Sequence, residues 1–482
     1  MYPQCRICIF TRIIREFGPK CQFWKEDLMK VMKFGGSCLR DSDHFLRVAE
    51  IIRSEKDRSV IVVSAIFGVT DLIIEGIQTA LDSETKISPF IKSLEDRHRR
   101  IIQEAIKTKG IREKAISSIE ERLEKLERLL YGVVYTEDIT DSVRALILSY
   151  GERFCAHILS GVIRDKSRVS LPLESDQIGL ITDESFENAT ADLMETRKNL
   201  DRSVGSLVRK GIIPVITGYF GCTRKGKITT FGRGGTDYSA AVIAHGLCAD
   251  ELEIWKDVDG FMSADPKIVD GAKKINSLSY YEAAELSYFG AKILHPRTVE
   301  PVMEDNIPIC IKNLNAPDND GTRLLKRSPE RKDVVKSVTF NRDISLLRIR
   351  GPGVGYKPGV IAEIGHTLSE LGINIFSVIT SQTCINLLLD RKDSFESFES
   401  IQDLGDGVIE KVELEDGIAL VSVVGKGLQN RRGIAARVFS AVAAEKINVE
   451  MISSGASEVA SYFIIKDGDV EKTINAIHRE FF

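Results

Sequence analysis

The feature that most constrains the fold is a series of short, almost purely apolar segments, each followed at once by small or polar residues. SVIVVS at 59–64 and GIIPVIT at 211–217 are the clearest examples. Apolar runs of this length, without alternation, are typical of strands covered on both faces in a parallel sheet. Similar strands are predicted at 31–34 and 251–255, with helices between them. We therefore expect an α/β domain whose strand ends meet at one edge, where ligands bind in open α/β folds.

The first predicted strand ends in a turn that suits an anion. Lys33 lies at the end of the strand, and Gly35 and Gly36 follow it. A strand, a glycine turn and a helix together offer backbone N–H groups to phosphates. The spacing matches neither the P-loop nor the dinucleotide fingerprint. Because a lysine at a strand end is usually solvated, this motif alone only suggests an anion site.

A second turn, TFGRGGTDYSA at 230–240, combines several groups that bind anions. Arg233 can hold a carboxylate or a phosphate through two parallel hydrogen bonds, and the two glycines after it let backbone N–H groups approach closely. Thr236 or Asp237 can begin the helix predicted at 238–247, whose amino terminus favours negative charge. The alternative is an ordinary glycine loop followed by a helix cap. The rest of the chain has to decide between the two.

A predicted helix at 141–159 carries an acidic and a basic residue side by side, Glu152 and Arg153. They can form a structural ion pair, or the carboxylate can receive the ammonium group of a substrate. Gly151 costs about 1 kcal/mol relative to alanine inside a helix, which suggests that something approaches closely there. The sequence leaves both interpretations of the carboxylate open.

The last third of the chain is an internal duplication. A polar, turn-rich linker is predicted at 316–335. Strand, turn, helix and strand then follow at 343–379 and again at 418–452. We expect each copy, at 336–412 and 413–482, to form a small βαββαβ-like layer of helices on an antiparallel sheet.

Composition excludes several classes of partner. The chain has 66 basic and 70 acidic side chains and a formal charge of -4, so neither nucleic acid nor an anionic membrane is an expected partner. No apolar run approaches the roughly 20 residues needed to cross a bilayer. Nine scattered cysteines are typical of reduced thiols, and we expect a cytoplasmic protein. Residues 1–29 are expected to be a non-functional extension, because their CxxC pair lacks the further ligands of a zinc site. No metal site built from protein ligands alone is predicted.

Five motifs in order, followed by the duplication, resemble a known family. They are VMKFGGSC, SYGERF, FGRGGTDYSA, WKDVDGFMSADP and FGAKILHPRT. Over residues 30–482 the chain resembles the aspartokinases, members of the amino-acid-kinase superfamily that phosphorylate the side-chain carboxylate of L-aspartate. The resemblance implies a three-layer α/β domain with a mainly parallel central sheet at 30–315. It also implies two C-terminal α+β, ferredoxin-like ACT domains, which sense amino acids.

The resemblance implies a role for each matching residue. Lys33, Gly35 and Gly36 would cradle the transferring phosphoryl group, Glu152 would accept the ammonium group of aspartate, and Arg233 would hold a carboxylate of it. Further substrate contacts would come from Thr70, Tyr219 and Thr236. ATP with Mg²⁺ would be bound by Lys33, Ser64, Ala65, Asp237, Lys256, Asp257, Met262, Lys267 and Lys292. Among these, Asp237 would organise the metal and the phosphates.

The implied chemistry needs no general base, because an aspartate side chain is already ionised at neutral pH. Positioning and charge neutralisation remain for the protein. The implied function is the first step of lysine, threonine and methionine biosynthesis, inhibited by an amino acid that binds the ACT domains. Asn374, Ile375 and Gln382 are the predicted effector residues, and Gln382 favours threonine over lysine. A homodimer or larger homo-oligomer formed through the ACT domains is expected.

Two alternatives remain open. One is a kinase for another acidic amino acid, such as glutamate or N-acetylglutamate. The other is a catalytically silent amino-acid sensor, which predicts loss of the charged site. The charged residues expected of an active site are nevertheless all present, namely Lys33, Glu152, Arg233, Asp237 and Lys292.

Overall fold

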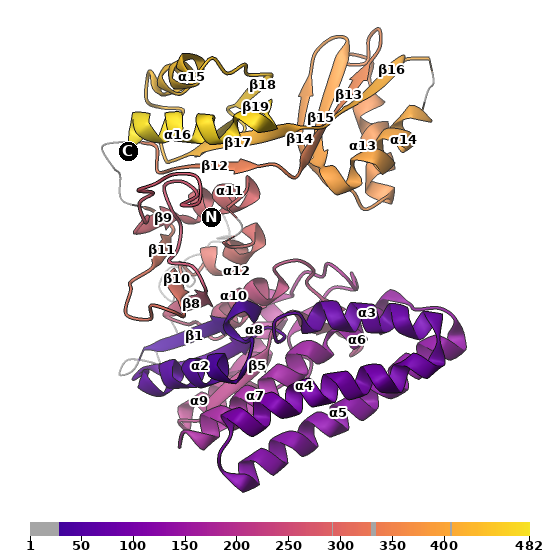
Figure 1. Cartoon of the computed structure of the whole chain (residues 1–482), viewed down its shortest axis with the longest axis vertical. Helices are drawn as coiled ribbons and strands as arrows, with labels where there is room; N and C mark the ends of the chain where they lie inside the picture. Colours follow the sequence, from indigo (N-terminus) through magenta and orange to yellow (C-terminus); the bar gives the residue numbers. More distant parts are fainter. Residues whose placement is uncertain (1–27, 292, 329–333, 405–406) are drawn as a thin grey trace, which may run out of the picture. The chain divides into compact units, whose positions relative to one another are not determined.

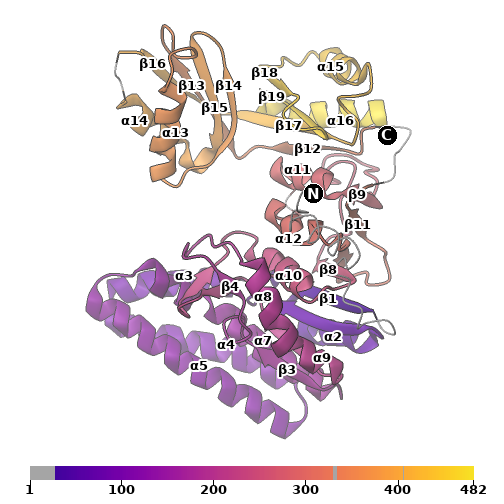
Figure 2. The same cartoon turned by 180° about the vertical axis from the view of Figure 1, so that it is seen from behind.

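The computed structural model describes residues 28–291, 293–328, 334–404 and 407–482. The chain divides into two compact units, and Figures 1 and 2 show their elements from opposite sides. The first unit contains the described residues up to Gly260 together with Leu294–Arg327. The second contains Phe261–Ile293 and Ser328–Phe482.

The first unit is built on a mainly parallel sheet. Its strands lie in the order β3-β5-β2-β1-β8-β10-β11. They are β1 (Met29–Phe34), β2 (Arg58–Val63), β3 (Ser170–Leu173), β5 (Ile213–Thr217), β8 (Glu251–Lys256), β10 (Ile309–Asn313) and β11 (Thr322–Leu325). Only β11 runs antiparallel to its neighbour among these strands. A smaller sheet joins β4 (Ile181–Thr182), β6 (Phe220–Thr223) and β7 (Ile228–Thr230).

Helices cover both faces of the main sheet. On one face α10 packs against β1 and β8, with α8 outside it, and on the other face α7 packs against β3 and β5, with α2, α4 and α5 around it. Met32 and Phe34 belong to the buried core shared with α2, α4, α5 and α7, so Lys33, which alternates with them, faces α10. The helices are α2 (Ser42–Ser54), α3 (Val69–Asp82), α4 (Ile87–Ala105), α5 (Lys109–Thr136), α6 (Asp141–Leu148), α7 (Tyr150–Asp165), α8 (Leu193–Leu200), α9 (Ser206–Arg209), α10 (Gly235–Gly246) and α12 (Glu300–Met303).

Strand register brings four loops to one edge of the sheet. Phe34 of β1 lies opposite Val63 of β2 and Trp255 of β8, and Val63 lies opposite Thr217 of β5. Because these strands are parallel and in register, their carboxyl ends align. The loops that follow therefore meet, as the sequence predicted.

The second unit contains two four-stranded antiparallel sheets with helices, besides β9 (Ser277–Ser279) and α11 (Tyr280–Tyr288). The first sheet has the order β14-β15-β13-β16, and the second has the order β12-β17-β19-β18. The first uses β13 (Ile344–Arg350), α13 (Val360–Glu370), β14 (Ile375–Thr380), β15 (Cys384–Asp390), α14 (Ser394–Gln402) and β16 (Lys411–Glu415). The second uses β12 (Ser337–Asn341), β17 (Ile418–Val424), α15 (Ile434–Ala444), β18 (Met451–Ser454), β19 (Ala460–Lys466) and α16 (Val470–Phe481). The predicted fold class is confirmed.

The strand pairing of the two repeats does not follow the boundaries expected from the sequence, 336–412 and 413–482. The strand β12 pairs with β17 and completes the second sheet, although it lies in the stretch assigned to the first copy. The strand β16 pairs with β13 and so reaches past residue 412. The edge position beside β17 is thus filled by a strand that precedes the first repeat in the sequence.

Smaller differences have local causes. The linker predicted at 316–335 contains β11, whose buried Thr322 and Leu324 flank the exposed Arg323 within a polar stretch. The helix predicted at 141–159 is two helices, α6 and α7, which meet at Ser149. The expected extension at 1–29 lies outside the described residues except for its last two, and Met29 already begins β1. Among the described helices, none is both long and apolar enough to cross a membrane.

Candidate active site

A buried cluster of three charges lies where β1 and β8 end and α10 begins. The Lys33 Nζ is 2.5 Å from Asp237 Oδ1, and the Lys256 Nζ is 3.3 Å from Asp237 Oδ2. The Lys33 and Asp237 side chains are each 6% exposed. Two cations around one carboxylate leave this cluster net positive, as a phosphate site requires.

The cluster fixes the charge of Asp237. Burial favours the neutral acid, but Lys256 and Lys33 outweigh it and lower the pKa of Asp237 to about 2. Burial lowers the pKa of Lys33, and the Asp237 carboxylate opposes that effect. Asp237 is therefore ionised at physiological pH and holds both lysine side chains in place.

The glycines after β1 allow close approach. A Cβ on Gly35 would lie 3.2 Å from the Lys33 Nζ, and a Cβ on Gly36 would lie 3.3 Å from the carbonyl oxygen of Ala65. The absence of a side chain on Gly36 lets the loops after β1 and β2 approach closely, and its absence on Gly35 leaves room for the Lys33 ammonium group. The predicted glycine turn thus packs directly beside the lysine that it was expected to assist.

The turn before α10 depends on glycine for a different reason. Gly234 has a φ of 72°, and a Cβ there would lie 2.3 Å from the Cβ of His295. The adjacent Arg233 is exposed, and its guanidinium is free of any hydrogen bond or ion pair recorded for the described residues. An exposed arginine on a tightly packed turn is available to a ligand.

Glu152 is a buried carboxylate with one unused oxygen. It is 3% exposed, and its Oε1 accepts the N–H of Ala65 at 2.9 Å. Its Oε2 has no hydrogen-bond partner in the described part of the chain. Burial raises the pKa of Glu152 to about 8. Such a group gains strongly from a cationic partner.

Arg153 is not that partner, which answers the question that the sequence left open. Its guanidinium binds Glu174 and lies 3.2 Å from Asp176, and one face of the guanidinium stacks on the ring of Phe220. Glu174 also binds Arg122 at 2.6 Å. Sequence reasoning missed this network, because no local motif links Glu174 to the helix that carries Arg153.

The remaining predicted substrate residues lie on the loops around this site. Tyr219 follows β5 with a φ of 70°, and its N–H donates to Ser239 Oγ of α10 at 3.1 Å. Burial and the nearby Glu152 raise the pKa of the Tyr219 phenol to about 12. Thr236 is buried at the start of α10, and Thr70 is half-buried in the first turn of α3. Their contacts with a substrate stay predictions.

The predicted nucleotide residues are only partly gathered. Ser64 and Asp257 follow β2 and β8 at the shared edge, and the N–H of Ser64 donates to the Phe34 carbonyl. The N–H of Ala65 is already engaged by Glu152. Met262 and Lys267 belong to the second unit, and Lys292 lies outside the described residues. The nucleotide contacts of all these residues stay predictions.

A magnesium ion fits this site only together with a nucleotide. Within the described ranges, no group of three or more His, Cys, Asp or Glu side chains is placed to bind a metal ion. Asp237 supplies one ionised carboxylate, and both of its oxygens face lysines. Mg²⁺ commonly binds through one or two carboxylates and substrate phosphates, so the donor set suits an ion that arrives with its nucleotide.

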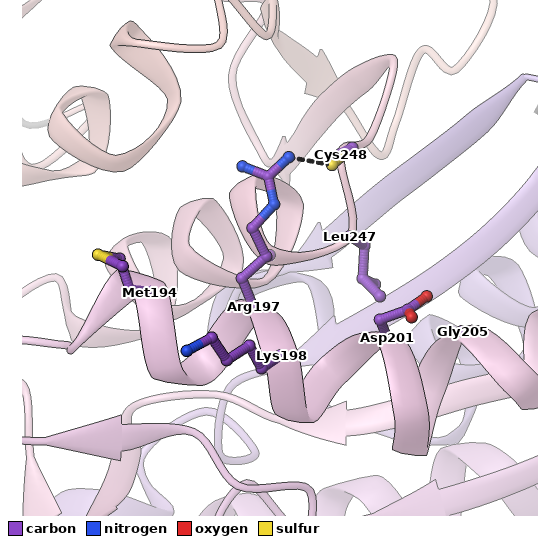
Figure 3. Close-up of a pocket in the computed structure, with 8 residues that line it drawn as sticks. Met194, Arg197, Lys198, Asp201, Gly205, Leu247 and Cys248 are labelled. Carbon is purple, nitrogen blue, oxygen red and sulfur yellow. Dashed lines mark hydrogen bonds between the residues drawn. The ribbon is translucent and has the colours of Figure 1, made fainter. Parts of the chain in front are cut away.

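A separate cavity of about 410 Å³ lies between α8 and the end of α10 (Figure 3). Arg197 on α8 donates to the Sγ of Cys248 at 2.6 Å across it. Met194, Lys198 and Asp201 line the helix side, and Leu247 lies beside the cysteine. None of the predicted site residues that the structure describes lines this cavity. It is distinct from the charged cluster.

The predicted effector residues lie around β14 in the second unit. Asn374 comes directly before β14, and the hydroxyl of Tyr288 at the end of α11 donates to the Phe376 carbonyl of that strand at 3.3 Å. The same helix is anchored by Glu282, which is fully buried and binds the Lys336 ammonium at 2.9 Å. Ile375 begins β14, whereas Gln382 lies in the turn before β15. The helix α11 thus contacts the predicted effector strand directly.

Comparison with known proteins identifies the family. A model described as the amino acid kinase family matches residues 29–313, and one described as an ACT domain matches residues 421–481. Aspartokinase 3, chloroplastic, of Arabidopsis thaliana is 32% identical over 471 residues, covering 95% of this chain and 82% of that protein. The chain is a member of the aspartokinases. A bifunctional aspartokinase/homoserine dehydrogenase of Buchnera aphidicola is 30% identical, and the chain spans 56% of its length.

Solved aspartokinase structures agree with the fold. E. coli aspartokinase III in complex with aspartate and ADP has a TM-score of 0.80 and 26% identity, covering 94% of this chain and 100% of that one. The aspartate kinase of Clostridium acetobutylicum has a TM-score of 0.72 at 26% identity. This chain is thus a kinase-fold aspartokinase with C-terminal ACT domains, as the five motifs predicted.

Proposed function

We propose that this chain transfers the γ-phosphoryl group of ATP to the side-chain carboxylate of L-aspartate, which gives 4-phospho-L-aspartate. The observation that carries the proposal is the buried Glu152, whose unused oxygen can receive an ammonium group. The cationic cluster of Lys33, Lys256 and Asp237 at the same sheet edge supports the phosphate half of the site. The related E. coli enzyme, in complex with aspartate and ADP, supports the substrate pair.

In the proposed reaction, a carboxylate oxygen of aspartate attacks the γ-phosphorus and the bond from that phosphorus to the β-phosphate oxygen breaks. The electron pair of the broken bond stays on ADP, so no proton has to be removed from the attacking group. Lys33 lies where it can neutralise charge on the transferring group, and Lys256 can do so nearer the leaving nucleotide. Mg²⁺, arriving with ATP, would screen the remaining phosphate charge and be held in part by Asp237.

Substrate orientation is assigned to three groups. Glu152 would hold the ammonium group, and Arg233 would hold a carboxylate through parallel hydrogen bonds. Thr70, Tyr219 and Thr236 would line the space between. Removing the ammonium-binding carboxylate from water before the substrate arrives raises its pKa, and a substrate cation reverses that effect.

We further propose that an amino acid inhibits the enzyme through the ACT domains, and that its site includes Asn374, Ile375 and Gln382. The hydrogen bond from Tyr288 to the carbonyl of Phe376, which follows Ile375 in β14, supports a link from that site to α11. A relative, E. coli aspartokinase III, has been solved in complex with lysine and aspartate in a T-state. Threonine stays the preferred effector here because of Gln382. Assembly through the ACT domains, a cytoplasmic location and a place in lysine, threonine and methionine synthesis remain predictions.

A coupled assay of ADP release tests the proposal. Purified full-length protein would be supplied with MgATP and, in turn, L-aspartate, L-glutamate and N-acetyl-L-glutamate, each with and without added threonine or lysine. Aspartate-dependent ADP release supports the proposal, and preference for another acceptor replaces it with the kinase alternative. If none of the three acceptors leads to ADP release, while threonine or lysine still binds, the silent sensor is favoured.

A further inference from the structure

An arginine that the five motifs did not single out lies at the same sheet edge. Arg40 follows the glycine turn after β1, and its guanidinium carbon lies 4.7 Å from the ring centroid of Phe67 in the loop after β2. Its Nη2 is 3.4 Å from Asp257 Oδ2 in the loop after β8. One side chain therefore spans the three loops that follow β2, β1 and β8.

The base beneath this arginine is fixed. The N–H of Phe67 donates to the Leu39 carbonyl at 3.1 Å, and Arg97 donates to the Phe67 carbonyl at 2.5 Å. A Cβ on Gly36 would lie 3.7 Å from the Phe67 Cα, so the aromatic residue lies directly beside the glycine turn. The Phe67 side chain is 53% exposed, which is unusual for a large apolar residue unless something covers it.

The guanidinium itself is only weakly held. The Arg40 and Asp257 side chains are 43% and 47% exposed, and a solvent-exposed ion pair of this kind contributes little. In contrast, Lys33 and Lys256 are both engaged with the buried Asp237. Of Arg40, Lys33 and Lys256, the cation most easily drawn to a highly charged nucleotide is therefore the arginine. Arginine also matches phosphate oxygens with two parallel donors, which lysine cannot do.

We propose that Arg40 is a phosphate-binding residue, which holds the β- or γ-phosphate of the nucleotide while its guanidinium lies flat on Phe67. The inference rests on the proposed kinase function and adds a residue and a supporting ring to its nucleotide site. Before the nucleotide binds, Asp257 keeps the guanidinium in place over the ring. When phosphate binds, the charge-assisted hydrogen bonds replace this exposed ion pair.

Binding measurements with full-length protein and a set of nucleotides test the proposal. Titration calorimetry of Arg40→Ala with MgATP, MgADP and AMP is expected to show about a 10-fold loss of affinity for ATP and ADP. Affinity for AMP should stay within about twofold, because a merely structural role would weaken all three alike. Arg40→Lys should recover part of the loss, and Phe67→Leu should lose part of the affinity without any change of charge.

Arg47 provides a matched control, because it is an exposed arginine on the following helix that contacts Asn315. Arg47→Ala should bind all three nucleotides like the wild type. In steady-state kinetics, Arg40→Ala should raise the KM for ATP and leave the KM for aspartate unchanged. Equal loss for AMP and ATP, or unchanged ATP affinity, overturns the inference. If the wild type binds ATP but does not phosphorylate aspartate, the proposed acceptor fails while the phosphate contact still stands on the calorimetry.

Discussion

Replacing Glu152 by glutamine should weaken aspartate binding while making the folded protein more stable. The substitution keeps the shape of the side chain and its acceptor for the Ala65 N–H, and removes the charge. Losing one partner of a buried charge pair costs about 2–5 kcal/mol. Since about 1.36 kcal/mol corresponds to a factor of ten, a loss of about 2 kcal/mol predicts roughly a 30-fold rise in the KM for aspartate. The KM for ATP should change little, because the group faces the acceptor.

The stability effect follows from the raised pKa. Below pH 4.5, the ordinary value for this group, the carboxyl is protonated in both the folded and the unfolded chain. Between pH 4.5 and the folded pKa of about 8, unfolding releases a proton, so the free energy of unfolding falls as pH rises. At pH 7 this deficit amounts to about 3 kcal/mol, and above pH 8 it stays constant. Because glutamine does not ionise, the Glu152→Gln variant should lack this loss of unfolding free energy.

Two measurements check this reasoning. The melting temperature of Glu152→Gln should exceed that of the wild type, and the difference should grow from pH 5 to pH 8. The wild-type kcat/KM for aspartate should rise towards pH 8 as the carboxyl ionises, and the variant should lack this rise. Glu253→Gln is the control for the aspartate effects. Burial also raises the pKa of the Glu253 carboxyl, but this residue is not among the predicted substrate contacts. A Glu152→Gln variant with a normal KM for aspartate, or with lowered stability, would refute the assignment.

Three further outcomes are expected. Lys33→Ala should lower kcat by at least about 100-fold without unfolding the protein, and near-normal turnover would remove the phosphate role of that lysine. Arg233→Ala should raise the KM for aspartate more than the KM for ATP, and the reverse would assign the arginine to the nucleotide. Tyr288→Phe loses the hydroxyl that donates to the Phe376 carbonyl of β14, and should raise the half-inhibitory concentration of threonine or lysine by roughly 2- to 10-fold. Tyr281→Phe, which changes an exposed tyrosine on the same helix, should leave inhibition unchanged, and identical inhibition curves for all three proteins would contradict the link.

The sequence could predict those parts of the site that local patterns encode. Lys33 and the glycines after it lie within a few residues, and buried strands fix the common edge to which they project. The partner of Arg153 could not be predicted, because Glu174 is brought to it by packing of α7 against β3. Arg40 was missed for a similar reason, since its significance depends on loops that follow two other strands.

The fold likewise has parts that local sequence patterns predict and parts that depend on tertiary packing. Continuous apolar runs predicted the parallel strands β1, β2, β5 and β8 within one or two residues, because burial on both faces leaves little ambiguity, whereas β3 and β10 were not predicted. The pairing of β12 with β17 was not predictable from the repeat, since the repeat pattern describes each copy as if it closed on itself. Likewise β11 was hidden in a polar stretch, where only two buried side chains mark it.

The pairing of β12 with β17 also makes the first repeat removable. The two strands are antiparallel neighbours, and Asn341 at the end of one lies opposite Leu420 near the start of the other. Residues 342–417 therefore leave and re-enter the second sheet at almost the same place, as the loop of a hairpin does. Since the entropy of closing a loop grows only slowly with its length, a short turn in their place would leave the second sheet intact. This protein therefore offers a natural point at which one sensing domain can be cut out or exchanged while the second sheet keeps its strand pairing.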